Sequence, residues 1–243
     1  MADDKRSAVN LLPTATSTDV LERQPRVAVL PIGSFEQHGQ YLPLITDTAV
    51  ACIVGQEIAA AYPVHLLPPI TISCSHEHAA FPGTVSISAK TLLAVIDDIR
   101  ASLARSGVDK LVIINGHGGN YVLSNVVQEA NVDGPTMSLF PLGPDWSRAR
   151  ERGGLVSDRH GDMHAGEIET SILLHAAPYL VRDGFADADH DGGDRPFLLV
   201  RGMSEYTKSG VIGFPSQATA DKGKAVLESL QSSFAQHLEA LGE

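Results

Sequence analysis

Short apolar runs that alternate with longer helical patterns constrain the fold of this 243-residue chain more than any other feature. The runs typical of buried strands are residues 26–32, 64–68, 110–115 and 136–139. The stretches whose apolar spacing indicates helices are residues 46–61, 88–106, 121–131 and 220–241, with a further helix that follows His164 and ends before Pro178. Because strands that alternate with helices build parallel sheets covered on both faces, we expect an α/β fold with a mostly parallel sheet.

Three segments show neither pattern. Residues 1–22 are polar, and we expect a loose lead-in with a short helix at Ser17–Glu22. Residues 141–162 have a loop-like pattern, and residues 183–195 are acidic and glycine-rich, as in a surface loop. The length of the chain fits one large domain or two small ones.

Charge and composition exclude several classes of protein. The formal net charge is −11 and no basic stripe is present, which argues against a nucleic-acid partner. No apolar run is long enough to cross a bilayer, and the polar N-terminus does not resemble a signal peptide. Cys52 and Cys74 form no disulfide framework. We therefore expect a cytoplasmic protein with reduced thiols and no membrane partner.

The loop after the first predicted strand carries Glu36, His38 and Asp47. Glu36 and His38 are two residues apart, so in extended backbone their side chains point the same way. Imidazole and carboxylate ligands suit Zn, Mn or Fe. A polar loop in which Thr46 or Asp47 merely caps the next helix is the alternative.

A second candidate, His117, follows the third predicted strand between Gly116 and Gly118. Ligands of parallel sheets bind beyond the carboxyl ends of strands, so His117 is expected near the first loop. A phosphate cradle is a weak alternative because neither a third glycine nor a lysine follows at the required position. A plain turn remains equally possible.

Residues 163–174 place two carboxylates on different faces of a predicted helix. Apolar residues follow Glu169 at helical spacing, whereas Glu167 is followed by Thr170 and Ser171. A carboxylate on a buried face needs a partner, so Glu169 is the better ligand, with a buried ion pair to an arginine as the alternative. His164 precedes the helix and is free to act as an acid or base.

The segment 73–88 is predicted to be a long loop containing His76 and His78. We expect His78 to form a pocket wall and leave the role of His76 open. Asp145 and Trp146 either shape a substrate flap or, in the case of Trp146, anchor the packing of a loop.

Together these motifs resemble those of the creatininase (creatinine amidohydrolase) family. The matching segments, in family order, are Gly33–Gly39, Leu42–Leu44, Asp47–Thr48, Phe81–Thr84, Asn115–Asn120 and His164–Ser171. The resemblance implies a single three-layer α/β/α domain over residues 1–243 and a homohexamer. It also implies two divalent metal ions per subunit and hydrolysis of C–N amide bonds other than peptide bonds.

The resemblance assigns the metal ligands residue by residue. Glu36, Asp47 and His117 match the ligands of one ion, and His38, Asp47 and Glu169 match those of the other, with Asp47 bridging. Ligands rich in carboxylate and free of cysteine admit Zn, Mn or Fe.

Catalytic and substrate-binding residues are also implied. His164 matches the catalytic histidine and would protonate the leaving nitrogen, while Glu167 would orient His164 or contact substrate. The residues expected to bind substrate are His78, Phe81, Gly118, Gly119 and Trp146.

One departure narrows the expected substrate. Creatininase proper has a glutamate two residues after the ligand histidine, where this chain has Gly119, and its pair of tryptophans cannot be matched because Trp146 is the only one. The chain therefore looks closer to the formamide-hydrolase and mycofactocin branches. We expect a small heterocyclic formamide or cyclic amide, with a formylamino-pyrimidine first. The alternatives are a creatinine-like lactam, peptide trimming, or a non-catalytic metal-binding assembly subunit, against which the intact His164 argues.

Overall fold

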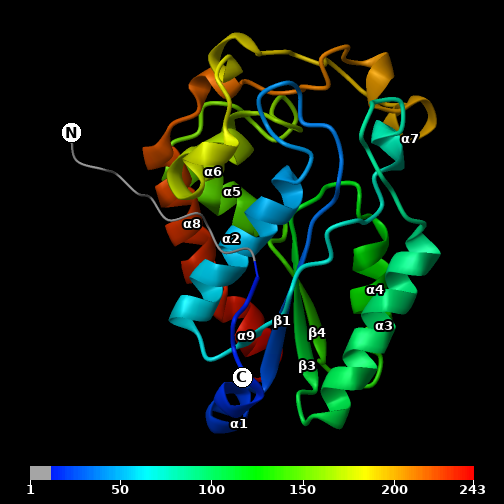
Figure 1. The fold of residues 1–243 in the computed structure, drawn as a ribbon, viewed down its shortest axis with the longest axis vertical. Helices are drawn as coiled ribbons and strands as arrows, with labels where there is room; N and C mark the ends of the chain where they lie inside the picture. The colour runs from blue at the N-terminus through cyan, green and yellow to red at the C-terminus, as the bar shows by residue number, and fades with distance from the viewer. Residues whose placement is uncertain (1–11) are drawn as a thin grey trace.

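A computed structural model describes residues 12–243, and its centre is a parallel sheet with the strand order β2-β1-β3-β4 (Figure 1). The strands are β1 (Val27–Ile32), β2 (His65–Leu66), β3 (Lys110–Asn115) and β4 (Met137–Phe140). Val29 is in register with Val112, and Ile114 with Phe140. The predicted parallel α/β fold is confirmed.

Helices cover both faces of this sheet (Figure 1). One face carries α2 (Thr46–Ala61), α5 (Gly143–Gly153), α6 (Glu167–Ala176), α8 (Ala220–Ser233) and α9 (Ala235–Ala240). The opposite face carries α3 (Ala89–Arg105) and α4 (Val122–Ala130). Two short helices, α1 (Ser17–Arg23) and α7 (Leu198–Arg201), lie outside these layers. The arrangement is the three-layer α/β/α sandwich that the resemblance implied.

Alternate residues of β1 explain why its sequence is apolar throughout. Val27 and Val29 pack into the core under α2 and α8, whereas Ala28 and Leu30 pack into the core under α3 and α4. Both faces of the strand are buried, so no position is left for a polar side chain.

Two glycines bring the strand ends against the first turn of α2. A Cβ atom on Gly33 would lie 2.2 Å from the backbone nitrogen of Thr48, and one on Gly116 would lie 2.3 Å from the carbonyl oxygen of Asp47. Larger residues would push β1 and β3 away from α2. The loops after β1 and β3 therefore meet at Asp47.

Some predicted boundaries are wrong. Residues 141–162 are not entirely loop, because α5 begins at Gly143, where the Asp145 carboxylate accepts a hydrogen bond from the Leu142 N–H. This helix is highly polar, so its apolar periodicity is weak. The predicted terminal helix ends at Ser233 and resumes as α9 beyond Phe234, a fully buried side chain.

The N-terminal prediction is confirmed in part. The helix expected at Ser17–Glu22 is α1, which Thr16 caps by accepting a hydrogen bond from the Asp19 N–H. The remainder of the lead-in that we predicted includes residues 1–11, which lie outside the described residues. Among residues 12–243, no helix is long and apolar enough to cross a membrane.

Candidate metal centre

Asp47 lies at the centre of a buried cluster of imidazoles and carboxylates. One of its oxygens, Oδ1, lies 2.9 Å from His38 Nε2, and the other, Oδ2, lies 3.0 Å from His117 Nδ1. Both histidines are buried, and they arrive on the separate loops that follow β1 and β3. The structure thus brings together residues that are 79 positions apart, from His38 to His117, around one carboxylate.

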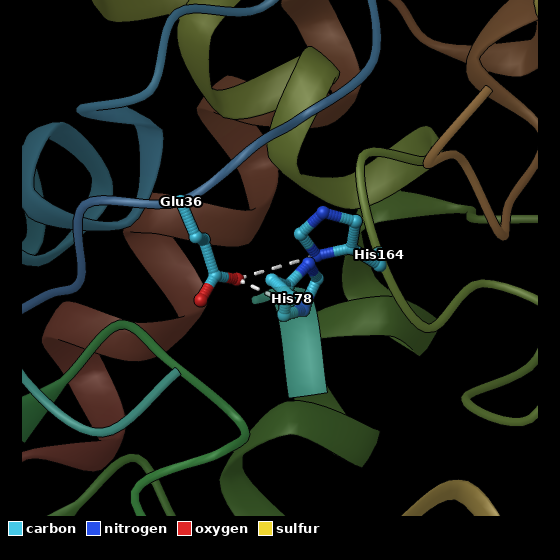
Figure 2. Close-up of side chains that lie close together, drawn as sticks. All are labelled: Glu36, His78 and His164. Atoms are coloured by element: carbon cyan, nitrogen blue, oxygen red, sulfur yellow. Dashed lines mark ion pairs between the residues drawn. The ribbon is translucent and has the colours of Figure 1, made fainter. Parts of the chain in front are cut away.

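Glu36 is fully buried beside this pair, and its carboxylate points toward two further imidazoles (Figure 2). Its Oε1 atom lies 3.2 Å from His117 Nδ1, 3.3 Å from His78 Nε2 and 3.7 Å from His164 Nδ1. Neither of its carboxylate oxygens accepts a well-directed hydrogen bond from any described residue. A buried carboxylate without such bonds is costly unless a cation neutralises it, so this donor set fits a metal ion.

Glu169 reaches the same cluster from the first turn of α6. Its Oε2 accepts a hydrogen bond of 2.6 Å from the Ala165 N–H, and its Oε1 lies 4.0 Å from His38 Nε2. Ala165 has a left-handed backbone (φ 52°), a strained conformation for a residue with a side chain. The ion pair with an arginine, our alternative for Glu169, is made instead by Asp162 with Arg150.

Ligand atoms gather in three overlapping groups in which all atoms lie within 4.8 Å of one another. The groups are Glu36–Asp47–His117, His38–His164–Glu169 and Glu36–His78–His164. The first has the composition predicted for one metal. The second contains His38 and Glu169 of the other predicted set, with Asp47 bonded to His38. The third was not predicted, because His78 was assigned to the pocket wall.

Gln37, which no sequence motif singled out, fixes the protons on two of these histidines. Its side-chain oxygen accepts from the Gly39 N–H, and its amide nitrogen donates to the Gly210 carbonyl, so the orientation of the amide is determined. The amide nitrogen also lies 3.0 Å from His78 Nδ1, which must accept, so the proton of neutral His78 is on Nε2.

His164 has its proton placed by the same residue. Its Nε2 lies 2.7 Å from the main-chain carbonyl oxygen of Gln37, so Nε2 donates and Nδ1 keeps the lone pair. Nδ1 is the atom that faces Glu36. The only signal for this role in the sequence is the position of Gln37 between Glu36 and His38.

Electrostatics separate the histidines into two kinds. Burial alone lowers the pKa of His38, but Asp47, Glu169 and Glu36 outweigh it and raise that pKa to about 9. Burial likewise opposes a charge on His117, yet Glu36 and Asp47 hold its pKa well above the usual value. For His164, burial and the nearby His38 and His78 push the pKa well below its usual value. The lowered pKa favours a neutral His164.

Glu167 does not lie in this cluster, contrary to the prediction that it orients His164 or contacts substrate. Its fully buried carboxylate lies 2.5 Å from Lys222 Nζ and accepts hydrogen bonds from the N–H groups of Val156 and Ser157 and from the Ser157 hydroxyl. Helix α8 packs on α6 and brings Lys222 to this face, which the pattern of α6 alone could not show. Contrary to the predicted faces, Glu167 is more buried than Glu169.

A cavity of about 340 Å³ opens onto the cluster. It is lined by the proposed ligands His117 and Glu169, and also by Gly118, Trp146 and Arg159. Trp146 also packs against the core, which agrees with its predicted packing role, while its role toward substrate stays a prediction. Of the other residues expected to bind substrate, Gly119 lines a separate cavity of about 490 Å³, Phe81 is half-buried, and His78 is buried beside Glu36.

Comparison with known proteins identifies the class. A family model described as "Creatininase: Creatinine amidohydrolase" matches residues 13–238. The chain belongs to the creatininase family, whose members include amidohydrolases, and it is a hydrolase of that family.

Individual members of the family are similar to this chain over most of its length. The mycofactocin precursor peptide peptidase of Mycobacterium ulcerans is 36% identical over 228 residues, covering 88% of this chain and 85% of that protein. The creatinine amidohydrolase of Pseudomonas putida is 31% identical over 221 residues, covering 83% and 84%. A solved mutant creatininase complexed with creatine has the same fold, with a TM-score of 0.79 and 22% identity over 94% of this chain and 97% of that one.

Proposed function

We propose that this chain is a metal-dependent amide hydrolase with two divalent ions at the cluster around Asp47. The observation that carries this proposal is the Asp47 carboxylate, whose two oxygens face ligand histidines from different loops. Glu36, Asp47 and His117 would hold one ion, and His38, Asp47 and Glu169 the other. Solved creatininases that share the fold are described as a Zn–Zn form and a Mn form, which supports Zn²⁺ or Mn²⁺, with Fe²⁺ as a further candidate.

The ions, when bound, would supply an activated water and polarise the substrate carbonyl. His164 would transfer protons as a general base and then a general acid. Its Nδ1 lone pair faces the cluster while its Nε2–H is held by the Gln37 carbonyl, so Nδ1 can accept a proton and return it to the leaving nitrogen. Its lowered pKa keeps it unprotonated before the reaction. His78, with its proton on Nε2, would steady the Glu36 carboxylate.

Two substrate classes compete. Relatives named as mycofactocin precursor peptide peptidases favour an amide bond of a peptide. A relative named as a formylamino-pyrimidine nucleotide deformylase, from Methanothermobacter marburgensis and 28% identical over 82% of this chain, favours the formamide predicted from sequence. We place the peptide first because those relatives are more similar over more of the chain.

Arg159 adds one requirement for either substrate. It lines the cavity at the cluster, and within residues 12–243 it has neither a hydrogen-bond partner nor an ion-pair partner. Its neighbour in the cavity, Arg150, is already paired with Asp162. A carboxylate or phosphate of the substrate would therefore meet Arg159, and Arg159→Gln should raise KM for acidic substrates more than for neutral ones.

The test begins with the metal content of the purified protein and of Asp47→Asn. Hydrolysis is then measured for three kinds of substrate: short peptides with free or amidated ends, formamides with and without an acidic group, and creatinine. Peptide or formamide hydrolysis that requires metal and is lost in Asp47→Asn is expected. Full hydrolysis by metal-free protein, or no hydrolysis of any amide by protein with two bound ions, would overturn the proposal.

A further inference from the structure

The outer nitrogen of His117 has partners of its own. While Nδ1 faces Asp47 and Glu36, Nε2 lies 2.9 Å from the Cys74 carbonyl oxygen and 3.4 Å from Glu77 Oε1. A carbonyl oxygen only accepts, so Nε2 carries the proton and the lone pair is left on Nδ1, toward the cluster. The Cys74 carbonyl accepts this N–H, and the Glu77 carboxylate flanks it at 3.4 Å. We propose that Glu77 is a positioning residue, whose carboxylate acts with the Cys74 carbonyl to orient this imidazole as a metal ligand.

The space occupied by Glu77 depends on Gly119. A Cβ atom at position 119 would lie 1.9 Å from Glu77 Oε1 and 2.4 Å from His117 Nε2. No other residue type can stand there while Glu77 keeps its place. This is the position at which creatininase proper is expected to carry a glutamate, so the carboxylate beside His117 here comes from a different loop.

A second glycine, Gly202, packs closely against the backbone of Glu77. Gly202 has a left-handed backbone (φ 71°), and a Cβ atom on it would lie 3.0 Å from the Glu77 carbonyl oxygen. The segment after α7 therefore packs directly on the turn that carries Glu77. Gly119 on one side and Gly202 on the other leave little room around Glu77, so its carboxylate is held against His117. A carboxylate on the surface would be free to move.

The Glu77 carboxylate is held away from solvent beside His117, since its side chain is only 11% exposed. A carboxylate on the outer N–H makes an imidazole a stronger ligand, and losing such a partner typically costs about 10–100-fold in metal affinity.

The inference rests on the proposed metal centre, and metal binding tests it directly. Zn²⁺ dissociation constants are measured by chelator competition for wild type, Glu77→Ala and Glu77→Gln, with His76→Ala as the matched control. His76 is on the same turn, but its side chain is exposed. We expect one of the two ions to bind about 10–100-fold more weakly in Glu77→Ala, less so in Glu77→Gln, and both to bind normally in His76→Ala.

Spectroscopy separates positioning from a general loss of folding. With Co²⁺ as the probe, Glu77→Gln should alter the visible absorption of one ion only, while circular dichroism stays that of wild type. Gly119→Ala tests the same contact from the other side, because the added methyl group must displace Glu77, so it should weaken the same ion.

The outcomes are distinguishable. If wild type binds no metal, both the proposed function and this inference fail. If wild type binds two ions and both Glu77 variants bind both within twofold of wild type, this inference alone is overturned. If Glu77→Ala does not fold, Glu77→Gln, which keeps the size of the side chain, decides the question.

Discussion

Replacing Lys222 with methionine tests whether Glu167 is a structural residue. The variant would leave a fully buried carboxylate without its cation, and removing one member of a buried pair costs about 3–5 kcal/mol. Two features reduce that figure. Glu167 keeps the N–H groups of Val156 and Ser157 as donors, and the Lys222 side chain is 19% exposed, so water can enter. We expect a loss of about 2–3 kcal/mol in the free energy of unfolding.

Urea unfolding and thermal melting measure the effect, and Lys224→Met is the matched control on the same helix. Lys224 is 60% exposed and lies 3.8 Å from the exposed Glu228, so its loss should cost under about 0.5 kcal/mol. For a chain of this size, Lys222→Met should lower Tm by about 5–10 °C. Adding Glu167→Gln to Lys222→Met should restore part of the stability, because no unpaired charge then remains.

The pH dependence of the free energy of unfolding is a second test of the Glu167–Lys222 pair. Burial opposes the charge of Glu167, but Lys222 and Ser157 outweigh it and lower its pKa in the folded state. The resulting stability is present above the unfolded pKa of about 4.3 and is lost as pH falls through the folded value. The gap between wild type and Lys222→Met should therefore be widest near neutral pH and narrow in acid. A gap below about 0.5 kcal/mol at pH 7, or one that widens in acid, would refute the structural role.

Three further predictions concern the cluster and its support. Asp47→Asn should abolish binding of both ions, since each proposed ligand set uses this carboxylate; metal analysis that finds either ion at full occupancy would contradict this. Gly33→Ala should cost at least about 1–3 kcal/mol in urea unfolding, because its Cβ would lie 2.2 Å from the Thr48 nitrogen. Metal affinity measured by calorimetry should rise from about pH 6 to pH 9, and fewer protons should be released on binding at the higher pH. The reason is that only neutral imidazole binds metal and the pKa of His38 is raised to about 9. An affinity independent of pH would argue against His38 as a ligand.

The sequence predicted the layers of this fold well because burial on both faces of a parallel strand leaves a strong local pattern. The sequence pattern did not predict α5, because this polar helix carries little apolar periodicity. The start of the helix is stabilised instead by Asp145, which accepts a hydrogen bond from the Leu142 N–H. The side chains predicted as ligands are close together for a similar reason, since Glu36, His38 and His117 follow the ends of neighbouring strands. The expected homohexamer and the cytoplasmic location stay predictions.

Contacts between distant segments could not be predicted from local patterns. Glu167 was expected to orient His164 or contact substrate because it was predicted on a polar helix face, yet Lys222, which decides its role, is 55 residues away. The structure resolves such cases by showing which buried carboxylates already have partners. Glu167 is fully satisfied by a cation and hydrogen-bond donors, whereas neither oxygen of Glu36 accepts a hydrogen bond from residues 12–243. Since an unsatisfied buried carboxylate persists only where a further partner compensates it, this difference supports the proposed metal centre at Glu36 and Asp47 and argues against a place for Glu167 in it.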